Sequence, residues 1–394
     1  MAWTEKYMDH GQGHPRRNGE GKTLYYSFVP SPLQEVAPTI QLSDAGVLML
    51  AECSNSLGRL EGMLKFVPNA EMYLMMYVRK EALLSAQIEG TQCTFDDVLN
   101  PECDNLVRKD VADVVAYVGA TEYAIERMKE LPLCMRLFRE VHRKLLEGTR
   151  GSDKNPGEIR TSQNWVGWTG CGISDAAYIP PNVDDMHTAL SDLEKFINED
   201  SSLNPIIKTA LIHYQFETIH PFLDGNGRLG RLLITLSLMH EGMLSDASFY
   251  PSYQLKMRRK EYYERLTAVR MNGEYAAWIE FFCSCLNVSA KDAANTLEKL
   301  SELHRRDENK IDSQMGRSSM NGRRLFTVLE ANPMVHAGFI EEKLGVSRTT
   351  ATNLINRFVE LGILKQMNQS KQRYRMFAYE DYLTLLRKDD QPLS

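Results

Sequence analysis

Apolar residues recur at helical spacing in one segment after another from Ser43 to about residue 290. Helices that bury one apolar face pack side by side, so this pattern predicts a mainly α chain built around a helical bundle. Ser43 is a suitable N-cap, and Pro205 suits a first helical turn. The clearest repeats are LSDAGVLMLAECSNSLGRLEGML (42–64), EMYLMMYVRKEALLSAQIEG (71–90), PIIKTALIHYQFETIH (205–220) and RLGRLLITLSLMHEG (228–242).

Three segments interrupt the helical pattern. Residues 1–40 are rich in glycine and proline and predict an irregular N-terminal arm. The segment TSQNWVGWTGCGISDAAYIPP (161–181) has β-branched and aromatic residues around a glycine-rich tip, which predicts a β-hairpin. The polar segment HRRDENKIDSQMGRSSMNG (304–322) predicts a linker.

Length and charge narrow the function classes. A chain of 394 residues is long enough for two or three domains. Its net charge of −6 excludes a polycation built as a whole for nucleic acid. Residues 305–375, however, hold 13 Lys and Arg against 7 Asp and Glu. Such a basic region in an acidic chain indicates separate partners for separate parts.

Three features predict a cytoplasmic protein with no membrane partner. The N-terminal residues are polar and lack the apolar core of a secretory signal. The longest apolar run, 232–239, is too short to cross a bilayer. The seven scattered cysteines form no CxxC pair and fit a reducing compartment.

The segment HPFLDGNGRLGR, residues 220–231, carries the strongest chemical signal. A helix ends at His220, a glycine-rich loop follows, and a new helix starts near Arg228. Glycines let backbone N–H groups approach a ligand, and a helix N-terminus attracts anions. Arg228 and Arg231 oppose the helix dipole there, so polyanion binding explains them better than helix stability does.

Two side chains of this segment suit catalysis. Asp224 could hold Mg²⁺ on bound phosphates, because Mg²⁺ usually takes one or two carboxylates together with phosphate oxygens. His220 has an ordinary pKa near neutrality and could act as a general base. The alternative is a helix-end histidine followed by a simple turn. The presence of all these elements within twelve residues favours the site.

The segment resembles the signature of the Fic family, HPFxDGNGRxxR, at every fixed position, and the resemblance extends over roughly residues 43–290. It implies a helical bundle with a β-hairpin flap, ATP as co-substrate, and transfer of AMP to a Ser, Thr or Tyr hydroxyl of a protein. His220 would deprotonate the hydroxyl and Asp224 would bind Mg²⁺. Phosphates would be held by Gly225, Asn226, Gly227, Arg228 and Arg231.

The same resemblance suggests where the base and the target bind. Val166, Gly167 and the hairpin would line the nucleotide and pair with an extended segment of the target protein. Tyr262 and Tyr263 would form walls of the adenine pocket, with packing on a helix face as the alternative. Some relatives read adenine with an asparagine where Arg270 stands here.

A second segment, SAQIEG (85–90), resembles the inhibitory motif of Fic proteins whose inhibitory helix precedes the core. Ser85 and Glu89 lie one helical turn apart, and Gly90 suits the position after a helix end. Glu89 would then pair with Arg231 and block productive binding of the γ-phosphate. A solvated glutamate at a helix end is the alternative.

The C-terminal residues look like a winged helix-turn-helix, with three helices and then two strands around a wing at 365–375. Ser347 would cap the third helix. Its exposed start, with the local positive charge, fits a DNA duplex, although such domains also bind proteins. The residues expected to contact DNA are Arg348, Thr349, Thr350 and Asn353.

These observations divide the chain into five predicted parts. They are the arm (1–40), a helical region with the inhibitory helix (41–115), the Fic catalytic core (116–290), a helix end and linker (291–320), and the winged domain (321–390). An autoinhibited AMP transferase is the first hypothesis. The alternatives are a DNA-binding regulator with a nucleotide-sensing core, or another phosphate-bond reaction such as UMP transfer, phosphorylation or AMP removal. Self-modification and a homodimer stay open.

Overall fold

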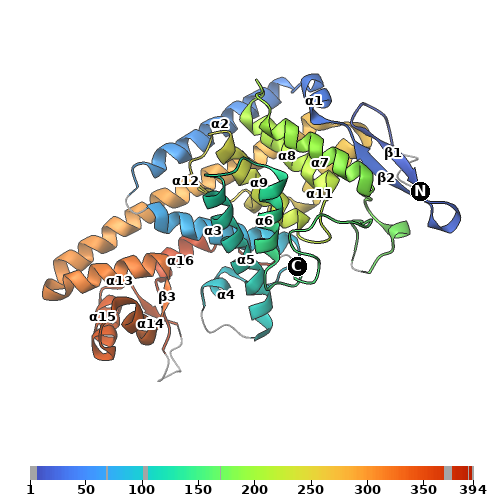
Figure 1. The fold of residues 1–394 in the computed structure, drawn as a ribbon. Coiled ribbons are helices and arrows are strands. Elements are labelled where there is room, and N and C mark those ends of the chain that lie inside the picture. The colour runs from blue at the N-terminus through green and yellow to red at the C-terminus, as the bar shows by residue number, and fades with distance from the viewer. Residues whose placement is uncertain are drawn as a thin grey trace.

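A computed structural model describes residues 7–67, 70–100, 105–168, 170–367, 375–388 and 390–392. Within these ranges the chain is mainly helical, as predicted (Figure 1). The helices up to the signature segment are α1 (Leu33–Val36), α2 (Asp44–Leu64), α3 (Ala70–Ile88), α4 (Phe95–Leu99), α5 (Asn105–Arg127), α6 (Met135–Leu146), α7 (Val183–Asn198) and α8 (Pro205–Ile219). The signature helix and those after it are α9 (Asn226–His240), α10 (Ser252–Met257), α11 (Arg259–Asn272) and α12 (Tyr275–Gln314).

The centre of the bundle is formed by α8 and α9, which pack together and are buried along almost their whole length. The predicted helix starts are confirmed. Ser43 accepts a hydrogen bond from the Gly46 N–H at 3.0 Å, and Pro205 occupies the first turn of α8. The loop between α8 and α9 is therefore fixed at both ends by buried helices, and this loop carries the signature residues.

The prediction of an irregular arm over residues 1–40 is wrong. Strands β1 (Gly13–Asn18) and β2 (Tyr25–Pro30) form an antiparallel hairpin, and β2 packs on α7 and α8. The glycines at 19 and 21 have positive φ and form the turn rather than an irregular segment. The aromatic and β-branched residues of YYSFVP favour a strand.

The flap between α6 and α7 reverses direction as predicted, but with little strand structure. One antiparallel bridge joins Val166 to Tyr178, and a short 3₁₀ turn (Ile173–Asp175) lies between them. The Phe28 N–H of β2 donates to the Ile179 carbonyl at 3.0 Å. The N-terminal hairpin thus contacts the C-terminal end of the flap through this hydrogen bond.

The predicted linker at 304–322 is also wrong, because α12 continues to Gln314 and α13 (Ser319–Ala331) begins soon after. Within this polar stretch Leu303, just before this polar stretch, and Asp307 and Ile311 within it are spaced by four residues and buried on one face. Tyr379 donates a hydrogen bond to the buried Asp307 carboxylate at 2.8 Å. A buried charged residue such as Asp307 makes the segment look polar in sequence, although the segment belongs to a packed helix.

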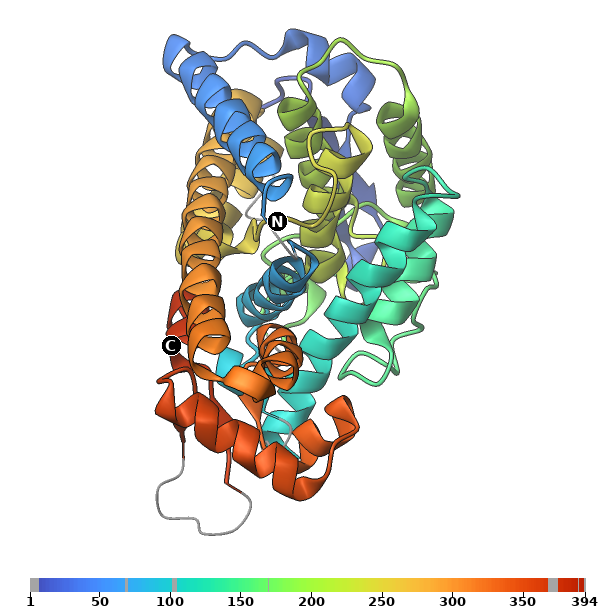
Figure 2. The same ribbon diagram turned by 90° about the vertical axis from the view of Figure 1, so that its left-hand side faces the viewer.

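The C-terminal elements gather at one end of α12 in both views (Figures 1 and 2). The three expected helices and the two strands after them are present, but a further strand, β3, lies between the first two helices and a helix, α16, follows the last strand; the sheet order is β3-β5-β4. Part of the expected wing, 368–374, lies outside the described residues. After α13 come β3 (Met334–Val335), α14 (Ala337–Leu344), α15 (Arg348–Glu360), β4 (Lys365–Gln366), β5 (Phe377–Ala378) and α16 (Glu380–Leu386).

This C-terminal part shares its core with the bundle. Tyr73 of α3 donates to the buried Glu330 of α13 at 3.2 Å, and the Gln87 side chain donates to the Asp390 carbonyl at 2.6 Å. Most of the buried apolar residues form one continuous cluster that runs from Leu33 to Leu386, and a smaller cluster lies around Met334 and Met376. None of the helices in the described ranges is long and apolar enough to cross a membrane.

Candidate active site

A cleft of about 370 Å³ opens where the α8–α9 loop, the flap, α11 and the end of α3 meet. Most of the residues predicted from the signature lie together on its wall. The predicted residues that line it are Glu89, Val166, Gly167, His220, Asp224, Gly225, Asn226, Gly227, Arg228, Arg231 and Tyr263, together with Arg270.

Two residues with positive φ shape the loop. His220 ends α8 with φ +51, and Gly225 precedes α9 with φ +77. The left-handed backbone at His220 is uncommon for a residue with a side chain and turns the chain sharply out of the helix. The first turn of α9, which starts at Asn226, offers N–H groups that have no partner within the helix. The backbone at the predicted anion site thus offers the N–H groups that binding an anion would use.

Asn226 fixes the loop from within. Its side-chain oxygen accepts from the Phe222 N–H at 2.9 Å, and its side-chain nitrogen donates to the Phe222 carbonyl at 2.8 Å. The amide group is buried and fully engaged. The side chain therefore holds the loop in shape, so the predicted phosphate contact of Asn226 would come from its backbone N–H.

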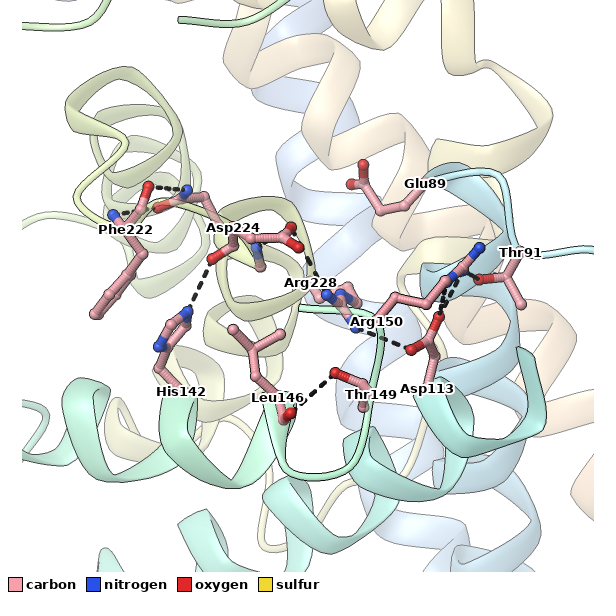
Figure 3. Close-up of polar contacts among 12 residues, drawn as sticks. Glu89, Thr91, Asp113, His142, Leu146, Thr149, Arg150, Phe222, Asp224 and Arg228 are labelled. Atoms are coloured by element: carbon pink, nitrogen blue, oxygen red, sulfur yellow. Dashed lines mark hydrogen bonds and ion pairs between the residues drawn. The ribbon is translucent and has the colours of Figure 1, made fainter. Parts of the chain in front are cut away.

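His142 on α6 is a functional residue that sequence reasoning missed (Figure 3). Its Nδ1 accepts the Gly157 N–H at 2.8 Å, so the proton is on Nε2, which donates to the Asp224 carbonyl at 2.8 Å. The ring stacks on Phe222 at a centroid distance of 3.8 Å. His142 thus positions the loop from outside, as Asn226 does from inside. Its long-range partners give no signal in the sequence.

We expect His142→Ala to lower the free energy of unfolding by about 3–5 kcal/mol at pH 7, since it removes a buried ring and leaves two buried backbone groups unpaired. Burial lowers the pKa of His142 from its usual 6.5 to about 4. The folded wild type therefore loses stability relative to the unfolded chain as the pH falls from about 6.5 towards 4. The variant lacks this histidine and does not lose stability in this way. The difference in free energy of unfolding between wild type and variant should therefore become smaller at low pH.

Denaturant unfolding at pH 7.5 and at pH 5.0 measures this difference. His187→Ala, at an exposed position on α7, is the matched control and should change stability little at either pH. A gap between wild type and His142→Ala that is the same at both pH values would contradict the assignment.

His220 lines the cleft. Its Nδ1 is buried, so Nε2 is the ring nitrogen available to a ligand there. Burial, followed by repulsion from Arg270, lowers the pKa of His220 to about 4, so the imidazole is neutral at pH 7. Its carbonyl accepts from Arg160 Nε at 3.1 Å and from the Asn164 side chain at 3.2 Å, which ties it to the flap segment.

Glu89 and Ser85 both bind Arg231, the second arginine of the signature. Arg231 Nη2 donates to Glu89 Oε1 at 2.7 Å, and Arg231 Nε donates to Ser85 Oγ at 2.9 Å. The Arg231 side chain is 1% exposed and that of Glu89 is 41% exposed. A Cβ atom at Gly227 would collide with Glu89 Oε1, so this carboxylate lies against the first turn of α9. There the helix dipole favours a negative charge.

Arg228 and Asp224 face the open part of the cleft. Arg228 is 8% exposed and lies 3.8 Å from Asp224 Oδ1 and 3.8 Å from Asp113 Oδ1. Arg228 Nη1 and Asp113 Oδ1 are buried without hydrogen-bond partners in the described part of the chain. Asp224 Oδ1 accepts the Gly225 N–H at 2.6 Å, and the side chain is 45% exposed. Among the described residues, Arg228 Nη1 is therefore in an ion pair but lacks a hydrogen-bond acceptor, which an oxygen of a ligand on this loop could supply.

The adenine prediction divides between two neighbouring tyrosines. Tyr263 lines the cleft, whereas Tyr262 is buried in the core with its hydroxyl 2.9 Å from His213 Nε2. Assigning Tyr262 to the pocket is therefore wrong, and packing on the helix face is its role. Arg270 lies over the Tyr178 ring at 3.8 Å and donates to Thr218 Oγ1 at 3.1 Å. Its guanidinium group thus braces the flap against α8.

Glu217 was not predicted, yet it lines the cleft one helical turn before His220. It is buried, and burial raises its pKa to about 7. A Cβ atom at Gly230 would collide with its Oε1, which shows how closely α8 and α9 approach here.

The fold and cleft define a helical protein with an anion-binding loop at a helix N-terminus, a histidine beside it and an internal carboxylate against it. Residues 47–126 match the Fic/DOC family N-terminal model, and residues 132–238 match the Fic/DOC family model. The chain therefore carries the paired domains of the Fic/DOC family. Known structures agree in fold, although they share little sequence with this chain.

Two such structures are a Fic family protein from Desulfovibrio desulfuricans and a Fic domain containing signaling protein from Bacteroides thetaiotaomicron. The first has a TM-score of 0.54 and 19% sequence identity, and the match covers 86% of this chain and 97% of the Desulfovibrio chain. The second has a TM-score of 0.51 and 20% identity, with 64% of this chain and 97% of its own covered.

Curated relatives include the proteins named protein adenylyltransferase Fic from Drosophila willistoni and Drosophila virilis. Each is 30% identical over 161 residues, or 40% of this chain. The match spans only 28% and 29% of those proteins, respectively, so it covers less than a third of their length.

Proposed function

We propose that this chain is a protein adenylyltransferase that moves AMP from ATP onto a Ser, Thr or Tyr hydroxyl of a protein, and that Glu89 keeps it inactive. The observation that carries the proposal is the position of His220. Its imidazole lines the cleft beside the loop that leads into α9, and Arg228 and Arg231 on the same cleft supply positive charge. The relatives named protein adenylyltransferase support the same reaction class.

In the proposed reaction the target hydroxyl oxygen attacks the α-phosphorus of ATP, and the bond from the α-phosphorus to the bridging oxygen breaks. Pyrophosphate leaves, and His220 takes the hydroxyl proton. The loop N–H groups and Arg228 stabilise the charge that develops on the phosphates. Arg231 would hold the γ-phosphate once Glu89 releases it.

The residues present fit a magnesium ion. Asp224 has a half-exposed carboxylate on the cleft, with one oxygen held by the Gly225 N–H. One carboxylate is sufficient when phosphates and water supply the other ligands. Bound Mg²⁺ would neutralise part of the phosphate charge.

The flap would receive the target protein. The N–H and carbonyl of Val166 already pair with residues 177–178 across the flap. An extended target segment would therefore have to pair with the outer edge of the flap. Trp165, which lines the cleft, and Trp168 are exposed on the flap, at 40% and 66%, and offer apolar contact area. Self-modification would use the same flap.

Mass spectrometry on the Glu89→Gly protein tests the proposal. Incubated with ATP and Mg²⁺ in a cell lysate, this variant should place AMP on itself or on other proteins, and Glu89→Gly/His220→Ala should not. A UMP adduct from UTP, a phosphoryl adduct, or removal of AMP from a modified protein would indicate one of the other phosphate-bond reactions. No adduct of any kind would favour a regulator that only senses nucleotide.

One observation keeps DNA binding as the second candidate. Arg348, Thr349 and Asn353 are exposed at the start of α15, which suits a winged helix-turn-helix that reads a duplex. Thr350 contributes less, because its N–H and hydroxyl both bond to the Ser347 hydroxyl in the helix cap.

A further inference from the structure

An arginine from outside the signature also reaches the cleft. Arg150 lies in the loop after α6 and lines the same cleft as Arg228 and Asp224 (Figure 3). Its side chain is 51% exposed. Arg150 Nε and Nη2 both donate to Asp113 Oδ2, at 2.9 and 2.5 Å. This paired contact gives the guanidinium group a fixed orientation.

Asp113 holds two arginines at once. Its side chain is 3% exposed, and its other oxygen, Oδ1, lies 3.8 Å from Arg228 Nη1. Two guanidinium groups therefore flank a single buried carboxylate on one wall of the cleft. Asp110 Oδ1 lies 3.4 Å from Arg150 Nη1, and Asp224 Oδ1 lies 3.8 Å from Arg228 Nη2, so carboxylates offset the charge of both arginines. The wall therefore offers guanidinium N–H donors and the partial positive charge of the α9 N-terminus, which suit a ligand with more than one phosphate.

Arg150 is also tied to the segment that carries the inhibitory glutamate. Arg150 Nη2 donates to Thr91 Oγ1 at 2.9 Å, and Thr91 follows Glu89 by two residues. The segment from Ser85 to Thr91 thus binds two cleft arginines, Arg231 through Ser85 and Glu89, and Arg150 through Thr91. If this segment moves, Arg150 keeps its contact with Asp113 and loses the one with Thr91.

We propose that Arg150 is a phosphate-binding residue of the cleft, acting on the phosphates beyond the α-phosphate of a bound nucleotide, and that the segment after Glu89 engages it in the inactive state. This inference rests on the proposed function. Asp113 is the residue that positions Arg150 and Arg228 for the same ligand. Arg228 Nη1 lies near Asp113 but makes no hydrogen bond within the described residues, and this supports a ligand here because a phosphate oxygen would supply the acceptor.

Calorimetry with ATP, ADP and AMP in the presence of Mg²⁺ tests this role in the Glu89→Gly protein. Arg150→Gln should weaken ATP and ADP binding about tenfold and leave AMP binding within about twofold, because AMP lacks the outer phosphates. Arg150→Lys keeps the charge, so its affinity for ATP and ADP should lie between the affinity of the parent and that of Arg150→Gln. Arg136→Gln is the matched control, since Arg136 is 67% exposed on α6, away from the cleft.

Equal loss of ATP and AMP binding, or no loss of either, would overturn the inference and leave Arg150 as a clamp between Asp113 and Thr91. If Arg150→Gln alone does not fold, Asp113→Asn/Arg150→Gln removes the buried charge with its partner and should show the same selectivity. Failure of the parent Glu89→Gly protein to bind any nucleotide would refute the proposed function as well. If the parent protein binds nucleotide and Arg150→Gln prefers ATP over AMP as strongly as the parent does, only this inference is refuted.

Discussion

Replacing Glu89 with glycine should raise the rate of AMP transfer by about tenfold to a hundredfold. The Glu89 carboxylate occupies both Arg231 and the first turn of α9, where the γ-phosphate would bind. A charge-assisted hydrogen bond of about 1.5–3 kcal/mol corresponds to a rate change of this size if it is made at the expense of the transition state. The gain should appear mainly in kcat, because the obstacle lies at the reacting end of the nucleotide.

The variant should remain folded. Glu89 follows the last residue of α3, so glycine there interrupts no helical turn. Arg231 is buried but keeps its bonds to Ser85 Oγ and the Ser85 carbonyl. We therefore expect the free energy of unfolding to fall by about 1–2 kcal/mol, somewhat more than for a surface ion pair.

Initial rates of self-modification at matched ATP and Mg²⁺ measure the effect. Glu89→Gly/Arg231→Ala should lose the gain, since Arg231 serves the phosphate as well as the inhibition. Glu71→Gly, at an exposed position in the first turn of the same helix, is the control for a lost carboxylate. If Glu89→Gly is no faster than wild type, Glu89 is only a helix-end glutamate.

Replacing His220 with alanine should lower AMP transfer by about 10²- to 10⁴-fold, the contribution typical of a general base. The phosphate-binding groups stay in place, so ATP affinity should remain within a few-fold of the parent. The pKa of about 4 predicts that kcat/KM stays flat from pH 8 down to about 5 and falls below that.

In the Glu89→Gly background, single-turnover experiments with labelled ATP measure the rate of AMP transfer, and calorimetry measures the affinity for ATP. His187→Ala, exposed and distant from the cleft, should retain full activity. Near-parental transfer by His220→Ala would exclude His220 as the base, and loss of ATP binding would indicate damage to the loop instead.

The sequence predicted what local patterns can encode. Helical periodicity and caps at Ser43, Pro205 and Ser347 gave the bundle, and the contiguous signature placed the loop at the N-terminus of α9. Tyr262 and Tyr263 show the limit of such reasoning. Adjacent helical residues point in different directions, and only the packing decides which of the two reaches the cleft.

The missed residues depend on contacts between distant segments. His142 meets the Asp224 carbonyl 82 residues further along the chain, and Arg150 meets Asp113 across 37 residues. Each reads as an ordinary polar residue on or after a helix. Their roles arise from burial and from partners that become neighbours only in the folded chain.

The 40-residue helix α12 has a consequence for how the chain tolerates changes in length. It is about 60 Å long and packs on α2, α8 and α11, and also on α13 and α16. One inserted residue would turn everything beyond it by about 100° and shift it by about 1.5 Å. The contacts of α13 with α3 would then be lost. Insertions and deletions are therefore expected in loops such as 199–204 rather than within α12, and the helix fixes the register between the two ends of the molecule.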